Sequence, residues 1–250
     1  MSEIVDLIRT WAAPHGLNLI GAVPLQLYNA AVAAQLQSNA IDRDARSVVV
    51  IGNGGGEFWG AYRRHVQQHP QWERREHPLD DFTRAVIENE IAGRVRQRGL
   101  RCTVVYPFAT GAANLHFMEL GRIAGIGGPS RLGILIHPVY GTWIALRAAL
   151  LMDEMLDVPG DGLGFDPCPQ CVPRACVPAC PAAAVSDRGW DVIACLKHRV
   201  ESAPDCAQGC YSRLRCVIGP QHRYPDDEIR HHQERALRSM REYYNKAFKG

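Results

Sequence analysis

The sequence lacks the features that mark membrane-spanning, secreted and strongly charged proteins. No apolar run approaches the ~18 residues that a membrane helix needs. The first residues, MSEIVDLIRTW, carry acidic side chains and no apolar signal segment. The 28 basic and 26 acidic residues leave a net charge of +2, so no global field attracts nucleic acid. We therefore expect a cytoplasmic protein with no membrane and no nucleic acid among its partners.

Cysteine is almost absent from the first two thirds of the chain and abundant after it. Of the nine cysteines only Cys102 lies outside the stretch 166–216, and we expect it to be a small buried apolar residue on a strand. Thiols crowded at short spacings hold metal in a reducing compartment or form disulfides in a secreted protein. The missing signal segment favours metal.

The spacing of the first four of these cysteines is C-x2-C-x4-C-x3-C-P, from Cys168 to Pro181. Bacterial ferredoxins have C-x2-C-x2-C-x3-C-P, and their fourth cysteine binds the other of two clusters. The middle gap here is longer by two residues. Eight thiolates suffice for two four-iron clusters, and the crossing pattern predicts two sets. The first cysteine set is Cys168, Cys171, Cys176 and Cys216, and the second cysteine set is Cys180, Cys195, Cys206 and Cys210.

Two other metal contents fit the same residues. C-x2-C pairs also suit a tetrahedral zinc site, which would make the segment structural. A single iron–sulfur cluster with spare cysteines is the second alternative. The widened gaps after Cys171, Cys206 and Cys210 support it.

Before the cysteines, helical and strand patterns alternate. With 46% apolar residues in 250, the chain can fill one large core and a smaller one. We predict an α+β fold with domains at 1–157, 158–220 and 221–250. The last is a helix that begins after Pro225, and its basic face is either solvated or a contact for a partner or RNA. We expect helices over 4–13, 25–37 and 77–99 and strands over 17–24, 45–53, 100–108 and 132–138.

Glycines cluster at two places where a backbone could approach a flat ligand. "NGGG" follows the strongest apolar strand, and a glycine-rich loop spans 124–128. Each is either a plain turn or a cofactor contact. His137, at the end of the expected strand, is more typical of a hydrogen-bonded strand end than of a ligand. The candidate cofactor contacts are Gly54, Gly55, Gly125, Gly127 and Gly128.

Two stretches together resemble a known family. "AGIGGPSRLGILIHPVYGTW" followed by "CPQCVPRACVPACPAAAV" is similar to epoxyqueuosine reductases and the related reductive dehalogenases. Those proteins have an AGLG-x-x-G loop, a strand ending near "HPxYGSW" and a two-cluster ferredoxin segment. Cys195 also matches, because the family has a cysteine some fifteen residues after its Cys-Pro. The resemblance covers roughly 45–216.

The resemblance implies a nitroreductase-like α+β domain that binds cobalamin and a ferredoxin-like segment whose two 4Fe-4S clusters supply electrons to it. The cobalamin-processing protein of methylmalonic aciduria has a similar domain without clusters. The family's DSAPV aspartate, its proton donor, has no counterpart in 111–115. The tryptophan after the AGLG loop is Gly128, and no tRNA-binding repeat region precedes Gly250.

We therefore expect an iron–sulfur oxidoreductase that passes electrons to a cobalamin-like cofactor for an unidentified substrate. The alternative is a ferredoxin-like electron carrier without its own substrate. Either would need an electron donor, such as a ferredoxin, a flavodoxin or a reductase. A proton donor near the cofactor would come from four residues suggested by side-chain type alone: His116, Glu119, Tyr140 and Arg131.

Overall fold

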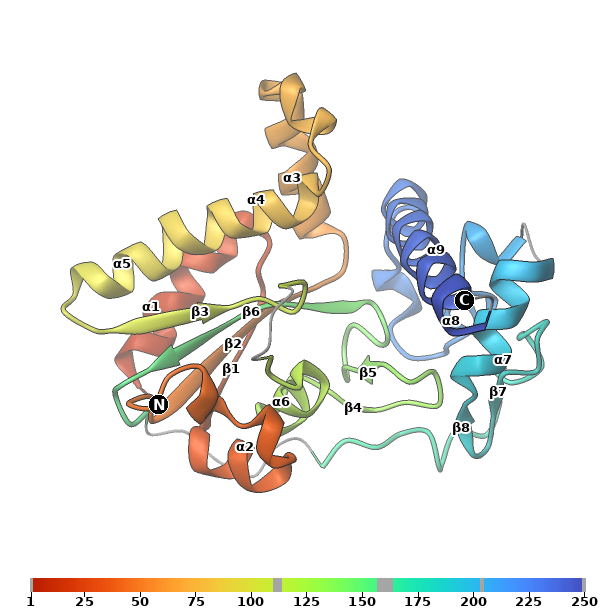
Figure 1. Cartoon of the computed structure of the whole chain (residues 1–250), viewed down its shortest axis with the longest axis horizontal. Helices are drawn as coiled ribbons and strands as arrows, with labels where there is room; N and C mark the ends of the chain where they lie inside the picture. The colour runs from red at the N-terminus through yellow and green to blue at the C-terminus, as the bar shows by residue number, and fades with distance from the viewer. Residues whose placement is uncertain (1, 110–113, 157–163, 203–204, 249–250) are drawn as a thin grey trace. The chain divides into compact units, whose positions relative to one another are not determined.

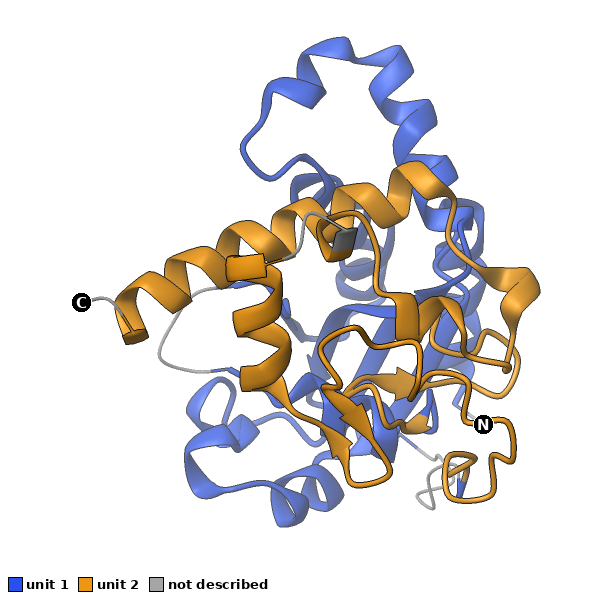
Figure 2. Cartoon of the chain, turned by 90° about the vertical axis from the view of Figure 1, so that its right-hand side faces the viewer, with its two compact units in different colours: residues 1–127, 144–164 blue, residues 128–143, 165–250 orange. Residues whose placement is uncertain are grey.

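The computed structural model describes residues 2–109, 114–156, 164–202 and 205–248. The chain forms two compact units (Figure 2). Unit 1 is Met1–Gly127 with Ile144–Gly164, and unit 2 is Gly128–Trp143 with Phe165–Gly250. The predicted division at 157 and 220 stays a proposal. The predicted division does not include one feature of the two units: Gly128–Trp143 belongs to the same unit as the cysteine segment.

Unit 1 is built on an antiparallel sheet with the strand order β1-β2-β6-β3. The predicted α+β fold class is therefore confirmed. All eight residues of β2 are buried, as its unbroken apolar run predicts. The strands are β1 (Leu19–Pro24), β2 (Ser47–Gly54), β3 (Cys102–Val105) and β6 (Ile144–Met152).

Helices cover both faces of this sheet (Figure 1). Val49 and Ile51 of β2 pack with α1, α3 and α4 in the main core, whereas Val48 and Val50 point to the face of α2 and α6. The helices are α1 (Glu3–Ala12), α2 (Leu25–Ala31), α3 (Glu57–Gln68), α4 (Pro78–Val86), α5 (Gly93–Gln97) and α6 (Phe117–Ile123). A π-helical segment, η5 (Ile87–Ala92), joins α4 to α5, and short 3-10 turns are η1 (Ala13–His15), η2 (Ala34–Leu36), η3 (Ser38–Ala40) and η4 (Pro70–Arg74).

Two expected elements differ from the structure. The predicted helix over 25–37 ends at Ala31, because the Asn29 side chain accepts hydrogen bonds from both the backbone and the hydroxyl of Ser38. Such side-chain acceptors compete with helix continuation. The predicted strand over 132–138 shortens to β5 (Leu135–Ile136), paired with β4 (Gly128–Pro129).

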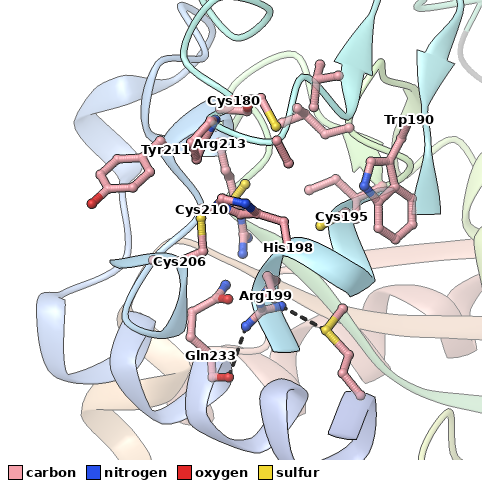
Figure 3. A pocket seen from close by; sticks show the side chains of 18 residues that line it. Cys180, Trp190, Cys195, His198, Arg199, Cys206, Cys210, Tyr211, Arg213 and Gln233 are labelled. Atoms are coloured by element: carbon pink, nitrogen blue, oxygen red, sulfur yellow. Dashed lines mark hydrogen bonds between the residues drawn. The ribbon is translucent and has the colours of Figure 1, made fainter. Parts of the chain in front are cut away.

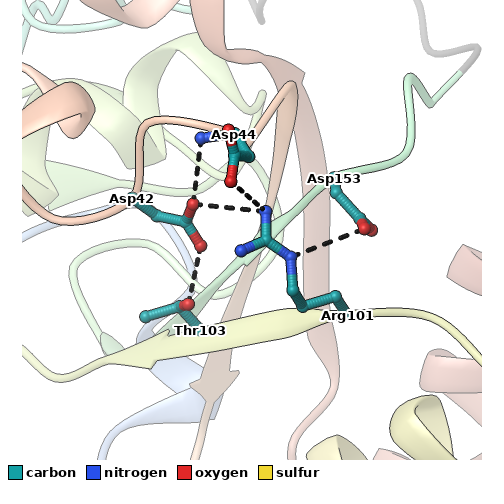
Figure 4. Close-up of polar contacts among 5 residues, drawn as sticks. All are labelled: Asp42, Asp44, Arg101, Thr103 and Asp153. Carbon is teal, nitrogen blue, oxygen red and sulfur yellow. Dashed lines mark hydrogen bonds and ion pairs between the residues drawn. The ribbon is translucent and has the colours of Figure 1, made fainter.

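An ionic cluster ties the ends of the sheet strands together (Figure 4). The Thr103 hydroxyl on β3 donates to the Asp42 carboxylate at 2.7 Å, and the Asp44 backbone N–H donates to it at 3.1 Å. Arg101 lies within 3.5 Å of Asp42, 3.3 Å of Asp44 and 3.5 Å of Asp153. One guanidinium thus joins the segments before β2, before β3 and after β6.

Unit 2 consists of short elements and one long helix. Its small core is Trp143, Tyr224 and Ile229, and the Arg213 guanidinium lies 4.4 Å from the Trp143 ring centre. The long helix begins after Pro225, as predicted, and buries Ile229, Leu237 and Tyr244. The remaining elements are the hairpin of β7 (Val185–Ser186) and β8 (Gly189–Trp190), α7 (Val192–Lys197), η6 (His198–Ser202), η7 (Asp205–Ala207), α8 (Tyr211–Leu214), η8 (Pro220–His222) and α9 (Asp226–Phe248). None of the described helices is long and apolar enough to cross a membrane.

Candidate metal centres

The eight clustered cysteines line two separate cavities in unit 2. All four members of the first cysteine set line a cavity of about 30 Å³. All four members of the second cysteine set line another, of about 210 Å³ (Figure 3). All nine cysteines of the chain are free thiols, and Cys102 is buried on β3, away from both sets in the sequence. The structure therefore groups the thiols in the sets that the sequence spacing defines, while metal binding stays a prediction.

Successive turns bring the first run of cysteines round on itself. Backbone N–H groups of Cys171, Val177 and Cys180 bond to carbonyls three residues earlier, at 2.9 to 3.3 Å. Arg174, inside the widened gap, adopts a left-handed φ of 42°. Left-handed backbone is costly outside glycine and is typical of functional loops. The two extra residues are thus accommodated in a tight turn.

The second cysteine set comes from four separate places in the chain of unit 2. Asp191 caps α7 by accepting hydrogen bonds from the N–H groups of Ile193 and Ala194, and this fixes Cys195 one residue further on. Cys206 lies on η7, and Cys210 precedes α8. Figure 3 shows the labelled cysteines arranged around one space, with Trp190 beside Cys195.

The thiols of each set influence one another electrostatically. Burial raises the pKa of Cys206, and Cys210, Cys180 and Cys195 raise it further. Burial likewise raises the pKa of Cys176, with Cys216 and Cys168 adding to the effect. Metal ligation requires thiolates, so binding would release these protons.

Trp190 and Arg199 favour the thiolate form within the second set. Burial raises the pKa of Cys195, while a hydrogen bond from the Trp190 indole and the charge of Arg199 oppose that rise. Arg199 follows Cys195 by four residues, so the helical geometry of α7 and η6 places both on one face. Sequence reasoning missed both residues, although the four-residue spacing from Cys195 was a usable signal for Arg199.

Arg131 lines the cavity of the first set, as Arg199 lines that of the second. Its side chain is only 10% exposed, and Nη1 donates to the Cys168 carbonyl while Nη2 pairs with Asp187 at 3.3 Å. The sequence suggested Arg131 only as a proton donor. Its position beside the first set instead suggests an electrostatic role there.

A short segment of unit 2 contributes to the walls of both cavities. Arg131 and Ile136 line the cavity of the first set, and Leu132 and Ile134 line that of the second. Gly133 between them has a left-handed φ of 69°, and a Cβ there would lie 2.3 Å from the Trp190 ring. The segment 131–136 therefore contributes to the lining of both cavities.

In the part of the chain that the structure describes, no group of three or more His, Cys, Asp or Glu side chains lies close enough together to hold a metal ion. The donor chemistry nevertheless fits an iron–sulfur cluster, because each cavity is walled by four thiols. The four thiols of the first set are half-buried, and the neighbouring Val172 is 90% exposed.

Two candidate cofactor glycines of the glycine-rich loop have structural roles within the chain. Gly125 (φ 71°) ends α6 in a Schellman motif. The Gly125 N–H donates to the Arg122 carbonyl, and the Ile126 N–H donates to the Gly121 carbonyl. A Cβ at Gly128 would lie 1.6 Å from the Phe165 carbonyl oxygen. These contacts explain two glycines of the loop without a ligand.

The "NGGG" turn is also bound by the chain itself. The Asn18 side chain accepts a hydrogen bond from the Gly54 N–H at 2.7 Å and donates to its carbonyl at 3.0 Å. Gly55 has a left-handed φ of 70°, and its carbonyl accepts from Asn53. Gly127 is buried. The assignment of these glycines to a cofactor stays a prediction.

Two of the suggested proton donors, His116 and Glu119, belong to unit 1, and the other two, Arg131 and Tyr140, belong to unit 2. His116 caps α6, with Nδ1 accepting from the Glu119 N–H at 3.0 Å, and Glu119 in turn pairs with Arg122. Tyr140 contacts His222 in unit 2, 4.7 Å between ring centres. Residues 111–113, opposite the family's DSAPV motif, lie outside the described residues.

His137 is hydrogen-bonded at the end of its strand, as predicted. Its Nδ1 accepts from the backbone N–H groups of Val139 and Tyr140, at 3.0 and 3.2 Å. Burial lowers the pKa of His137, and the nearby His222 lowers it further, so the neutral form that can accept these bonds is favoured.

Comparison with known proteins shows a likeness of fold without one of sequence. No protein-family model matches the chain, and no curated protein matches it in sequence. The B12-trafficking protein CblC from C. elegans superimposes with a TM-score of 0.62 over 96% of this chain and 95% of its own, at 14% identity. Epoxyqueuosine reductase from Streptococcus thermophilus superimposes with a TM-score of 0.55. The match covers 90% of this chain and 68% of the reductase, also at 14% sequence identity.

The reductive dehalogenase NpRdhA has the same fold over part of its length. It gives a TM-score of 0.55 at 17% identity, and the match covers 96% of this chain but only 36% of the dehalogenase. The resemblance inferred from the sequence is thus confirmed at the level of fold. At these identities the comparison establishes the fold alone.

Proposed function

We propose that this chain is an iron–sulfur oxidoreductase that passes electrons from two 4Fe-4S clusters to a cobalamin-like cofactor for the reduction of an unidentified substrate. The observation that carries the proposal is the division of eight free thiols into two sets of four, each lining its own cavity. Four thiols per site is the donor number that a 4Fe-4S cluster requires.

The surroundings of the thiols support electron transfer over a purely structural metal. When bound, such clusters supply one-electron transfer at potentials set by burial and by hydrogen bonds to their sulfurs. The chain offers both kinds of control, since Trp190 and Arg199 act on the second set and Arg131 lies at the first. Leu132 and Ile134 give the cavity of the second set an apolar wall.

The fold supports the cobalamin part of the proposal. CblC is named for B12 trafficking, and a further solved dehalogenase with this fold, which matches with a TM-score of 0.53, is described as B12-dependent. The electron donor would be a ferredoxin, a flavodoxin or a reductase. Free thiols on this scale require a reducing compartment, so we place the protein in the cytoplasm.

Anaerobic reconstitution with iron and sulfide tests the clusters. We expect about eight iron and eight sulfide per chain. Cys206→Ser and Cys216→Ser should each lose about half of both, whereas Cys102→Ser, a matched change outside the two sets, should keep the full content. Zinc in place of iron, or equal loss in all three variants, would contradict the proposal.

Cobalamin binding is tested separately on the reconstituted protein. Added cob(II)alamin should change its visible and EPR spectra with saturation near one equivalent, because binding would change the surroundings of the cobalt. An unchanged spectrum in the presence of intact clusters would contradict cobalamin binding and would leave the assignment of the clusters unaffected.

The second candidate function is an electron carrier without its own substrate. The contacts that Gly54, Gly125 and Gly128 make within the chain favour it, because they occupy backbone expected to face a cofactor. This candidate predicts reversible cluster reduction with no cobalamin binding and electron delivery to a partner enzyme.

A further inference from the structure

Each cysteine set has one arginine with an unsatisfied buried N–H. The Nε atoms of Arg131 and Arg199 are buried, and neither has a hydrogen-bond partner among the described residues. Arg131 lines the cavity of the first set and Arg199 that of the second. A buried donor without an acceptor costs about 1–3 kcal/mol. An acceptor bound in each cavity would satisfy this donor and remove the cost.

The two arginines differ in the compensation of their charge. Arg131 pairs with the Asp187 carboxylate at 3.3 Å. Arg199 instead donates to two uncharged acceptors, the Met240 sulfur at 3.2 Å and the Gln233 carbonyl at 3.3 Å (Figure 3). Within the described part of the chain Arg199 forms no ion pair. Its positive charge therefore acts on the second set without a neutralising partner.

We propose that Arg199 donates through Nε to a sulfur atom of the cluster in the second set and makes that cluster the more easily reduced of the two. The inference rests on the proposed function, which places clusters at both sets. Reduction adds one negative charge to a cluster, so a nearby uncompensated cation stabilises the reduced form more than the oxidised form. A hydrogen bond to cluster sulfur acts in the same direction.

The electron balance follows from this order of potentials. A one-electron reductant would reduce the cluster held by the four thiols of the second set, whose added negative charge Arg199 would stabilise. The reductant is oxidised by one electron for each transfer, and Arg199 stays protonated throughout. At equilibrium the cluster of the second set would therefore hold the electron in preference to that of the first.

An EPR-monitored redox titration of the anaerobically reconstituted full chain tests the inference. We expect two cluster potentials in the native protein. Arg199→Met should lower the higher potential by at least 59 mV, which is a tenfold loss in the reduction equilibrium constant for one electron. The lower potential should stay where it is.

Matched variants separate Arg199 from a general charge effect. Lys197→Met removes one positive charge two residues earlier, at an exposed position, and should shift the potential by much less. Arg199→Lys keeps the charge but lacks the Nε donor, so an intermediate shift is expected. Arg199→Lys also tests the inference if Arg199→Met fails to take up iron. Arg131→Met should shift the potential of the other cluster, which is held by the first set.

The outcomes distinguish this inference from the function on which it rests. The inference alone would be overturned if two clusters form but neither potential changes in Arg199→Met and Arg199→Lys. It would also be overturned if Lys197→Met shifts the potential as much as Arg199→Met does. A shift of the same cluster by Arg131→Met and Arg199→Met would also overturn it. Native protein that takes up no iron would overturn the proposed function, and the inference with it.

Discussion

Asp42→Asn removes one buried negative charge from the edge of the unit 1 sheet while preserving the shape of the side chain. The Asp42 carboxylate is only 8% exposed and accepts hydrogen bonds from the Thr103 hydroxyl and the Asp44 N–H (Figure 4). Hydrogen bonds to a charged group contribute about 1.5–3 kcal/mol. The Arg101 contact is longer, at 3.5 Å, and half exposed, so it adds less than ~1 kcal/mol. We expect a loss of about 2 kcal/mol in the free energy of unfolding at neutral pH.

The pH dependence gives this prediction its sign. Burial alone would raise the pKa of Asp42, but the Thr103 hydroxyl, the Asp44 N–H and the Arg101 charge outweigh it and lower the pKa below the ordinary 3.8. The carboxylate therefore stabilises the fold fully above the unfolded-state pKa. This contribution is lost as pH falls through the lower folded-state pKa.

Urea unfolding followed by tryptophan fluorescence measures the effect. The difference between native protein and Asp42→Asn should be constant from neutral pH down to about pH 5 and should shrink below about pH 4. Asp44→Asn is the matched control, because Asp44 is 78% exposed and shares the same arginine. It should cost less than ~1 kcal/mol. The reasoning would be refuted if the two substitutions lowered the free energy of unfolding equally, or if the loss caused by Asp42→Asn did not change with pH.

Three further predictions follow from unit 2. Gly128→Ala should destabilise it by about 3 kcal/mol or more in thermal unfolding, because the new Cβ overlaps the Phe165 carbonyl, whereas Gly164→Ala meets no atom within 4 Å and should be neutral. Trp190→Phe should raise the pKa of Cys195 and slow its alkylation in metal-free protein, since the indole donor is lost; unchanged alkylation would remove Trp190 from the site. His137 has a lowered pKa, so its stabilisation is complete above its ordinary value of 6.5 and is lost as pH falls below it. His137→Asn, which keeps an acceptor, should flatten the change in melting temperature between about pH 7.5 and 5.5.

The sequence predicted the elements whose signals are local. The buried run of β2, the start of α9 after Pro225 and the end of a long helix at Gly99, which has a left-handed φ of 80°, all depend on neighbouring residues. The central strand β6 carries no such local signal. Its sequence, IALRAALLM, is rich in helix formers, and only pairing with β2 and β3 on both sides makes it a strand.

The candidate site divides in the same way. The spacing of the cysteines alone defined the two sets, because ligands for a compact cluster must come from short turns and a crossing fourth residue. Arg199 could have been found from its four-residue distance to Cys195. No local signal could show that its charge is uncompensated, because Met240 and Gln233 lie some 40 residues away on α9.

The sequence by itself thus determined the α+β class and the membership of the two cysteine sets, since both follow from periodicity and spacing along the chain. Tertiary structure decided what the glycines and arginines do. Gly128 lies against Phe165 and Gly54 against Asn18, while Arg131 meets Asp187 and Arg199 does not meet a carboxylate among the described residues. These contacts join residues more than 30 positions apart, and no pattern of neighbouring residues specifies them.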